Sequence, residues 1–279
     1  MSIGFIGLGN IGRPMACQLL RLGEELWVYD VAAAAVAELA GRGARAGARV
    51  RDLAERCRII GVCVRDEPEV SSVLHGDDGL LAHAQPDAII AVHSTVNQAA
   101  ILEWAEQADK RGIHLLDAPI TGGAAGAEAA TLTYMVGGAS EVVERCRAVF
   151  LTSGQKIIHA GPVGSGILLK LCNNLMTYAA FAAADEAGRL AGAGGLDRGL
   201  LVEVGRSNGV MTSQMEAFLN NRSQLAAAGK LRQAFAPFAG LARKDLAAAL
   251  TSARELRLTL PSTERVAEII EQVFLNQDH

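Results

Sequence analysis

Short apolar runs alternate with helix-like stretches through the first half of the 279-residue chain. The runs are Ile3 to Gly7, Leu26 to Tyr29, Ile59 to Val64, Ala88 to His93 and His114 to Leu116. Between them lie Arg13 to Leu22, Val31 to Ala40 and Gln98 to Lys110. This alternation predicts a parallel sheet with helices on both faces, because uninterrupted apolar strands suit a sheet covered on both sides. Further strands are predicted at Thr131 to Val136 and Lys156 to His159.

Only helical patterns are recognisable after Gly161-Pro162. No proline interrupts Gly164 to Gly192, which predicts one helix of roughly 40 Å, long enough to join two domains. Further helices are predicted at Arg198 to Ser207, Thr212 to Leu219, Phe238 to Glu255 and Thr263 to Leu275. The predicted fold is therefore α/β over residues 1–161, followed by an all-helical domain over 162–279 that starts with the long interdomain helix.

The composition limits the classes of partner. Half of the residues are hydrophobic, enough for a sizeable core, and the net charge of -4 leaves no electrostatic footprint for nucleic acid. Lys170, Asp185 and other polar residues interrupt the apolar stretch 167–191, so a membrane span there would be costly. Five cysteines without a CxxC favour buried free thiols, and the chain opens on a strand instead of a leader. We expect a cytoplasmic protein that binds neither nucleic acid nor membrane.

The sequence Gly7-Leu8-Gly9-Asn10-Ile11-Gly12 lies between the first strand and the first helix. In this context the first glycine permits a tight turn, the second lets the backbone approach a pyrophosphate, and the third lets the helix pack on the strand. The N-terminus of the helix adds unpaired N–H groups that favour an anion. A glycine turn without a ligand is the simpler alternative. We predict that these six residues bind a dinucleotide.

Asp30 ends the second strand, where a carboxylate would hydrogen-bond a ribose hydroxyl and repel a 2′-phosphate. Val31, Ala32 and Ala33 follow, so no arginine is at hand to hold such a phosphate. The cofactor is therefore predicted to be NAD, with NADP less favoured. The structural alternative is an aspartate that caps the next helix.

Lys170 and Asn174 are four residues apart in the predicted long helix and share one face of it. A lysine among apolar residues loses hydration, which favours its neutral form and suits it to exchanging a proton. Asn174 could orient this lysine or bind a substrate hydroxyl. The structural alternative is a lysine that snorkels to solvent or pairs with an acid.

The stretch Asp117-Ala118-Pro119-Ile120-Thr121-Gly122-Gly123 follows the strand that starts at His114. Two glycines after a hydroxyl residue expose backbone N–H groups, which could form a nest for a carboxylate, although a plain turn is the alternative. The sequence has no GxSxG elbow and no HExxH helix, and its six histidines are scattered, so no metal site is expected. His93 is interpreted as structural.

Four motifs resemble those of the β-hydroxyacid dehydrogenases, the group that contains 3-hydroxyisobutyrate dehydrogenase and tartronate semialdehyde reductase. They are Gly7-Leu8-Gly9-Asn10-Ile11-Gly12-Arg13-Pro14-Met15, Asp117 to Gly123, Gly164-Ser165-Gly166 through Lys170 to Asn173-Asn174, and Lys244-Asp245-Leu246. Their order and spacing are more specific than any one of them, and the resemblance covers almost the whole chain.

The resemblance implies a Rossmann-type N-terminal domain, an all-α C-terminal domain and an active site in the cleft between them. It implies that Lys170 is the general acid/base and that Asn174 assists it. The implied activity is NAD-dependent dehydrogenation of the CH–OH group of a small 3-hydroxy acid, or reduction of its semialdehyde. Members of the family are usually homodimers or homotetramers.

The resemblance also assigns binding roles. Thr121, Gly122 and Gly123 would hold the substrate carboxylate, while Thr95 and Lys244 would contact the cofactor. The chain departs from the family pattern at four places: Thr121 for serine, Asn97 for a nearby proline, Ala129-Ala130 for a glycine, and Arg65-Asp66-Glu67 for a more apolar loop.

Two alternative functions remain. One is a related reductase of the same fold, either NADP-linked and acting on glyoxylate or succinic semialdehyde, or acting on imines. Asp30 argues against NADP, and Lys170 argues against an imine reductase, which usually lacks that lysine. The other is a non-catalytic dinucleotide-binding module, which would have no reason to keep Lys170, Asn174 and Lys244.

Overall fold

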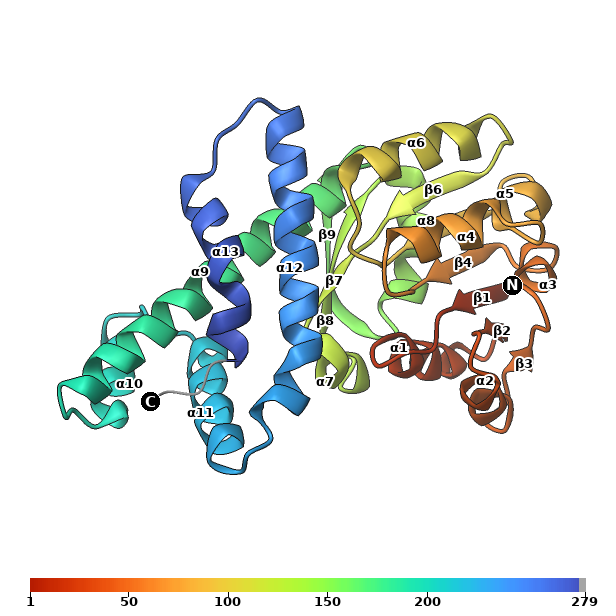
Figure 1. The fold of residues 1–279 in the computed structure, drawn as a ribbon. Helices are drawn as coiled ribbons and strands as arrows, with labels where there is room; N and C mark the ends of the chain where they lie inside the picture. Colours follow the sequence, from red (N-terminus) through yellow and green to blue (C-terminus); the bar gives the residue numbers. More distant parts are fainter. Residues whose placement is uncertain (276–279) are drawn as a thin grey trace. The chain divides into compact units, whose positions relative to one another are not determined.

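The computed structural model describes residues 1–275 and divides into two compact units, Met1–Lys170 and a second that begins at Leu171 (Figure 1). The strands of the first unit are β1 (Ser2–Ile6), β2 (Glu25–Tyr29), β3 (Arg45–Ala46), β4 (Ile59–Val62), β5 (Ile89–Val92), β6 (His114–Asp117), β7 (Ile120–Thr121), β8 (Leu132–Gly137) and β9 (Gly154–Gly161). Its helices are α1 (Gly12–Leu19), the 3₁₀ turn η1 (Leu20–Leu22), α2 (Ala33–Ala40), α3 (Val50–Ala54), α4 (Glu67–His75), α5 (Leu80–His83), α6 (Gln98–Asp109), α7 (Gly123–Glu128) and α8 (Ser140–Phe150). There follow α9 (Ser165–Ala193), α10 (Arg198–Ser207), α11 (Ser213–Ala227), α12 (Leu231–Glu255) and α13 (Pro261–Leu275).

One sheet runs through the first unit in the order β3-β2-β1-β4-β5-β6-β8-β7, with β9 beside β8. The strands from β3 to β6 are parallel, whereas β8 is antiparallel to β6 and β7. The chain leaves β1 toward β2 and β3 on one side and later fills β4, β5 and β6 on the other. The strand order therefore reverses between β1 and β4, and the carboxyl ends of these parallel strands share one edge.

The alternation of side chains along each strand builds a core on each face of the sheet. Ile3 and Phe5 of β1 pack in one cluster with residues of α1 and α8, whereas Ile6 and Ile60 pack in the other with residues of α4 and α6. Each fully buried aliphatic side chain contributes about 1.5–3 kcal/mol. The predicted parallel sheet with helices on both faces is confirmed, and the structure has no strand between residues 162 and 275.

The second unit is held by helices around a phenylalanine cluster. Phe181 of α9 stacks on Phe218 of α11 at 4.5 Å between ring centroids, and Phe274 of α13 meets both edge-on. α9 is, among the described residues, the one helix long and apolar enough to cross a membrane, with about a third of its most apolar stretch buried. The sequence predicted that this helix is buried on several sides. In the single chain, a smaller share of its residues is buried than that prediction implies.

Several elements differ from the sequence-based expectations for local reasons. β3 was not predicted because Arg45 and Ala46 are both exposed and carry no apolar pattern. α12 was predicted to begin at Phe238, after Pro237, yet it begins at Leu231 and continues through that proline. A proline inside a helix removes its own N–H donor, and its ring clashes with the carbonyl of residue i−4; packing of the apolar face of α12 outweighs this cost.

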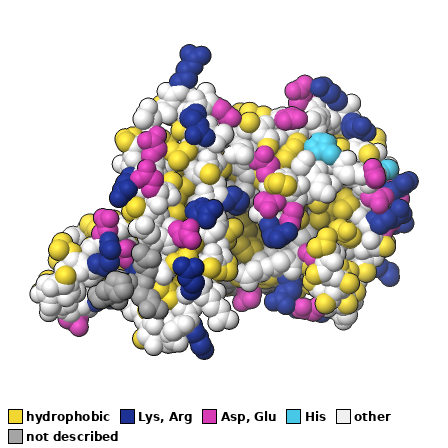
Figure 2. Space-filling view, in the orientation of Figure 1, with side chains coloured by type: hydrophobic (Ala, Val, Ile, Leu, Met, Phe, Trp, Pro, Cys, Tyr) yellow, Lys and Arg dark blue, Asp and Glu magenta, His cyan; other side chains and the backbone are white. Residues whose placement is uncertain are grey.

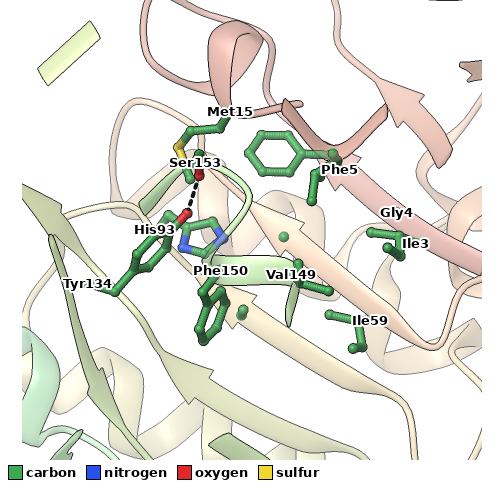
Figure 3. A pocket seen from close by; sticks show the side chains of 13 residues that line it. Ile3, Gly4, Phe5, Met15, Ile59, His93, Tyr134, Val149, Phe150 and Ser153 are labelled. Atoms are coloured by element: carbon green, nitrogen blue, oxygen red, sulfur yellow. Dashed lines mark hydrogen bonds between the residues drawn. The ribbon is translucent and has the colours of Figure 1, made fainter. Parts of the chain in front are cut away.

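His93, which was interpreted as structural, lies in the interior of the first unit. Its Nδ1 donates to the carbonyl oxygen of Ala118 at 2.8 Å, so the neutral ring carries its proton there. Figure 3 shows the imidazole among Phe5, Tyr134 and Phe150, next to a cavity of about 10 Å³. Such a volume holds about one water molecule at most, so this cavity is a packing defect and no substrate site.

Acid is expected to destabilise the first unit through His93. Burial lowers the pKa of the imidazole from 6.5 to about 4, and the hydrogen bond to Ala118 opposes this shift only in part. Because the folded pKa is depressed, unfolding takes up a proton between about pH 6.5 and pH 4. The free energy of unfolding should fall by about 1.4 kcal/mol per pH unit in that window, roughly 3 kcal/mol in all, and level off below it.

Fluorescence can follow this effect because both tryptophans, Trp27 and Trp104, belong to the first unit. Urea unfolding would be measured across the pH range for the wild type and for His93→Gln, which keeps an N–H donor but does not titrate. The difference between the two pH profiles isolates the contribution of His93. Parallel profiles would show that the imidazole is not the titrating group.

Candidate active site

The glycine-rich turn joins β1 to α1 with the geometry that its sequence predicts. Gly7 has φ of +94°, and a Cβ on Gly12 would lie 2.0 Å from the carbonyl oxygen of Gly7, so neither position accepts a side chain. A Cβ on Gly9 would meet nothing within 4 Å. Gly7 and Gly12 therefore pack against neighbouring backbone, whereas the backbone at Gly9 is accessible, and a pyrophosphate would approach it there.

Asp30 ties this turn to the end of β2. Its Oδ2 accepts a hydrogen bond from Leu8 N at 2.6 Å, and its Oδ1 accepts one from Ala32 N at 2.7 Å. The N-cap of α2 is Ala32, which has no side-chain cap, so the alternative interpretation of Asp30 as the capping residue is not supported. A carboxylate accepts about four hydrogen bonds, which leaves room for ribose hydroxyls.

The loops after β4 and β5 are joined by side-chain hydrogen bonds. Ser94 Oγ donates to Val64 O at 2.7 Å and accepts from Val64 N at 3.0 Å. Glu67 Oε2 accepts from both the backbone N and Nδ2 of Asn97, at 3.0 Å and 2.7 Å. Two departures from the family pattern, at 67 and 97, thus form one contact, and they hold the loop that carries the half-buried Thr95.

The glycine turn, Asp30 and the Thr95 loop follow β1, β2 and β5, which all end at the edge where the strand order reverses. Open α/β sheets bind nucleotides in the crevice at this place. The residues present therefore fit a dinucleotide, with the open backbone at Gly9 toward its phosphates and Asp30 toward a ribose. Among the described residues, no group of three His, Cys, Asp or Glu side chains could hold a metal ion.

The predicted carboxylate site begins at the short strand β7. Thr121 is half-buried, while Gly122 and Gly123 are exposed and have positive φ angles of +124° and +63°. A Cβ on Gly123 would meet nothing within 4 Å, so its backbone is accessible. Further along, Ala130 stands where the family often has a glycine and adopts φ of +57°, a conformation that costs a side chain about 1–2 kcal/mol.

Asp117, fully buried at the end of β6, connects this loop to the long helix. Its two oxygens accept hydrogen bonds from Gly164 N at 2.8 Å and Ile167 N at 2.7 Å, which are donors at the start of α9. Burial raises the pKa of the carboxyl, and the backbone donors act against that shift. A Cβ on Gly166 would lie 2.5 Å from Met135 O, so the helix start and the sheet are in direct contact.

The first two turns of α9 therefore stand at a defined place on the sheet edge, and they lead to Lys170. Lys170 is the last residue of the first unit, and its side chain is half-buried. Asn174 follows one turn later and is 7% exposed. Its Nδ2 donates to Asp245 Oδ2 at 2.7 Å, and Lys244 Nζ lies 3.1 Å from Asp245 Oδ1. Asn174 and Lys244, predicted from separate motifs, thus meet at one carboxylate.

Three residues at these places were not predicted as site residues: Glu67, Asp117 and Asp245. Asp245 had a readable signal, because it lies in the buried row of α12 that includes Ala242, Leu246 and Ala249, where a lone acid needs partners. Asp117 had a similar signal, because it is a single acid at the end of an apolar strand. Burial raises the pKa of the Cys57, Cys63 and Cys146 thiols to about 12, so these three thiols stay protonated at neutral pH. Cys172 is exposed, against the expectation of buried thiols.

Comparison with known proteins covers both units. Residues 2–161 match the family described as the NAD binding domain of 6-phosphogluconate dehydrogenase. Residues 164–279 match the family described as NAD-binding of NADP-dependent 3-hydroxyisobutyrate dehydrogenase. The chain belongs to the β-hydroxyacid dehydrogenase family. It is accordingly an oxidoreductase that uses NAD(P), as the resemblance implied, and its Rossmann-type fold with a helical C-terminal region is confirmed.

Individual relatives agree with this family assignment. An uncharacterised oxidoreductase of Mycobacterium tuberculosis is 41% identical over 261 residues, which are 93% of this β-hydroxyacid dehydrogenase and 88% of the relative. An NAD-dependent L-serine dehydrogenase of Pseudomonas aeruginosa is 39% identical over 74% of this chain and 69% of its own length. Among solved structures, Mycobacterium tuberculosis 3-hydroxyisobutyrate dehydrogenase with L-serine has a TM-score of 0.85 at 27% identity, covering 99% of this chain and 94% of that one.

Proposed function

We propose that this β-hydroxyacid dehydrogenase transfers a hydride between NAD and a small 3-hydroxy acid or its semialdehyde, with Lys170 as general acid/base. The observation that carries the proposal is the pair of hydrogen bonds from Gly164 and Ile167 to Asp117. They hold the start of the helix that bears Lys170 at the end of the strand that leads to the Thr121 loop. A base and a carboxylate site on one rigid sheet edge suit a substrate with hydroxyl and carboxylate groups close together.

The residues have distinct roles in the proposed reaction. The N–H groups of Gly122 and Gly123, with the Thr121 hydroxyl, hold the substrate carboxylate. Lys170 takes the proton from the substrate hydroxyl during oxidation and returns it during reduction, while Asn174 orients the hydroxyl. Bound NAD supplies the hydride acceptor. Thr95 and Lys244 contact the cofactor.

The choice of NAD over NADP rests on Asp30. Its carboxylate lies at the end of β2, where a 2′-phosphate would meet a like charge, and Val31 beside it is 93% exposed and offers no cation. The L-serine dehydrogenase relative is named as NAD-dependent. L-Serine is itself a 3-hydroxy acid, so it belongs among the substrates to be tried.

Reduction of NAD⁺ should be measured with 3-hydroxyisobutyrate, L-serine, glycerate and 3-hydroxypropionate, with NADP⁺ as the alternative cofactor. We expect turnover of at least one acid, faster with NAD⁺ than with NADP⁺. Silence with all of them, while NAD binds tightly in calorimetry, would contradict the proposal and favour a binding module. Preference for NADP⁺ would contradict the role of Asp30 alone.

We further propose that the protein is a homodimer or homotetramer. Leu190 and Leu196, at the end of α9 and after it, and Leu200 and Val204 of α10 expose more than half of their surfaces. Figure 2 shows hydrophobic side chains at the α10 end of the second unit, and charged side chains of both signs interspersed over this face. An exposed apolar row of this kind suits contact with a second copy. Sedimentation equilibrium should give a mass of two or four chains of 29.2 kDa, and a monomer would contradict this proposal.

A further inference from the structure

Asp245 of α12 has two hydrogen-bond donors and one ion-pair partner within the second unit. The side chain is 6% exposed. Its Oδ2 accepts hydrogen bonds from Asn174 Nδ2 at 2.7 Å and from the Tyr178 hydroxyl at 3.0 Å, and its Oδ1 lies 3.1 Å from Lys244 Nζ. The proposed function uses Asn174 and Lys244. It does not account for Tyr178.

Tyr178 lies one helical turn after Asn174 in α9, so both side chains reach the same carboxylate oxygen from one face of the helix. The phenol is half-buried. Burial raises its pKa, and the charge and hydrogen bond of Asp245 raise it further. The hydroxyl therefore keeps its proton at neutral pH and acts toward Asp245 as a donor.

The Asp245 carboxylate determines which way the Asn174 amide faces. A carboxylate only accepts hydrogen bonds, so the amide must turn Nδ2 toward it, and Oδ1 points elsewhere. Asn173 Nδ2 lies 3.4 Å from that Oδ1. Rotation of the carboxylate would release the amide. The Tyr178 hydroxyl opposes this rotation because it is bonded to the same oxygen as Asn174.

We infer that Tyr178 is a positioning residue of the reaction, which acts through Asp245 on the orientation of the Asn174 amide. The inference rests on the proposed function, in which Asn174 orients the substrate hydroxyl beside Lys170. Hydrogen bonds to a charged group are about twice as strong as neutral ones, so the hydroxyl is a substantial part of this network. Removing it leaves the ring in place but frees the carboxylate to turn.

The test is Tyr178→Phe, assayed on the preferred 3-hydroxy acid. We expect kcat/KM for the acid to fall about 10- to 100-fold, with the KM for NAD unchanged. Tyr134→Phe is the matched control, because it also removes a tyrosine hydroxyl with one side-chain partner, here Ser153, but from a side chain buried in the core of the first unit. That variant should lose thermal stability and keep kcat/KM. Equal kcat/KM for Tyr178→Phe and the wild type would overturn the inference.

A double-mutant cycle with Asp245→Ala separates positioning from simple stabilisation, because alanine removes the oxygen to which Tyr178 and Asn174 both donate. If Tyr178 acts through Asp245, Tyr178→Phe should change kcat/KM by less than about twofold in the Asp245→Ala background. A full effect in that background would overturn the inference and leave the proposed function standing. Absence of wild-type turnover on every acid would overturn the proposed function and the inference with it. Melting curves of all variants confirm that folded proteins are compared.

Discussion

Replacing Lys170 by alanine should lower kcat on the preferred 3-hydroxy acid by about 100- to 10,000-fold and leave the affinity for NAD nearly unchanged. The reason is that the proposed base is removed while the dinucleotide site stays intact. The glycine turn and Asp30 are bonded to each other through Leu8 N, and neither depends on α9. Initial rates and calorimetric titration of NAD would measure the two quantities separately.

The matched control is Lys110→Ala, which removes an exposed lysine that pairs with Glu106 at the end of α6. It should behave as the wild type, because exposed ion pairs contribute about 1 kcal/mol or less and this one lies on the helix surface. Lys170→Arg adds a second comparison: it keeps the positive charge but cannot give up a proton near neutral pH. Wild-type kcat in Lys170→Ala would refute the assignment of Lys170 as the base.

Combining Asp30→Ala with Val31→Arg should raise the ratio of kcat/KM for NADP⁺ to that for NAD⁺ by about 100-fold. The change removes a carboxylate that would repel the 2′-phosphate and adds a guanidinium that can bind it, a charge-assisted contact of about 1.5–3 kcal/mol. Val31 is 93% exposed, so an arginine at this position would not disturb the core.

Two single variants separate the contribution of the Asp30 carboxylate from that of the added guanidinium. Val31→Arg alone leaves the Asp30 carboxylate in place and should change the ratio less than the double variant. Asp30→Asn keeps an oxygen that can accept from Leu8 N, so it tests the charge of residue 30 while sparing the turn. An unchanged cofactor ratio in the double variant would show that Asp30 does not select the cofactor.

The sequence predicted those parts of the fold whose side-chain pattern is local. β4 and β5 were predictable because each is an uninterrupted run of small or apolar residues, and the structure buries all four residues of each strand. β7 was not, because a strand of two residues exists only through its antiparallel partner β8. The same division applies to α11, whose predicted end at Leu219 came too early: its last turns have a weak apolar pattern.

Some residues of the candidate site could likewise be predicted from local sequence, and others could not. Gly7, Gly9 and Gly12 could be assigned from spacing alone, since backbone geometry leaves little choice at a strand–turn–helix junction. Asp117 and Asp245 stand out as single acids in apolar patterns, but their partners could not be assigned, because these lie 47 and 71 residues away in the chain. Contacts over such separations follow from the packing of elements, and one sequence carries no direct sign of them. The resemblance located Lys170, while the structure shows how its helix is held.

The Glu67–Asn97 contact has an evolutionary consequence. Asn97 has φ of −70°, which proline also adopts, yet its backbone N–H is one of two donors to Glu67. Replacing Asn97 alone by proline would remove both donors to the half-buried Glu67 carboxylate. Replacing Glu67 alone would leave the backbone N–H and Nδ2 of Asn97 without this acceptor. The two positions are therefore coupled: the effect of a substitution at residue 97 depends on whether residue 67 is a glutamate, and the reverse holds for residue 67.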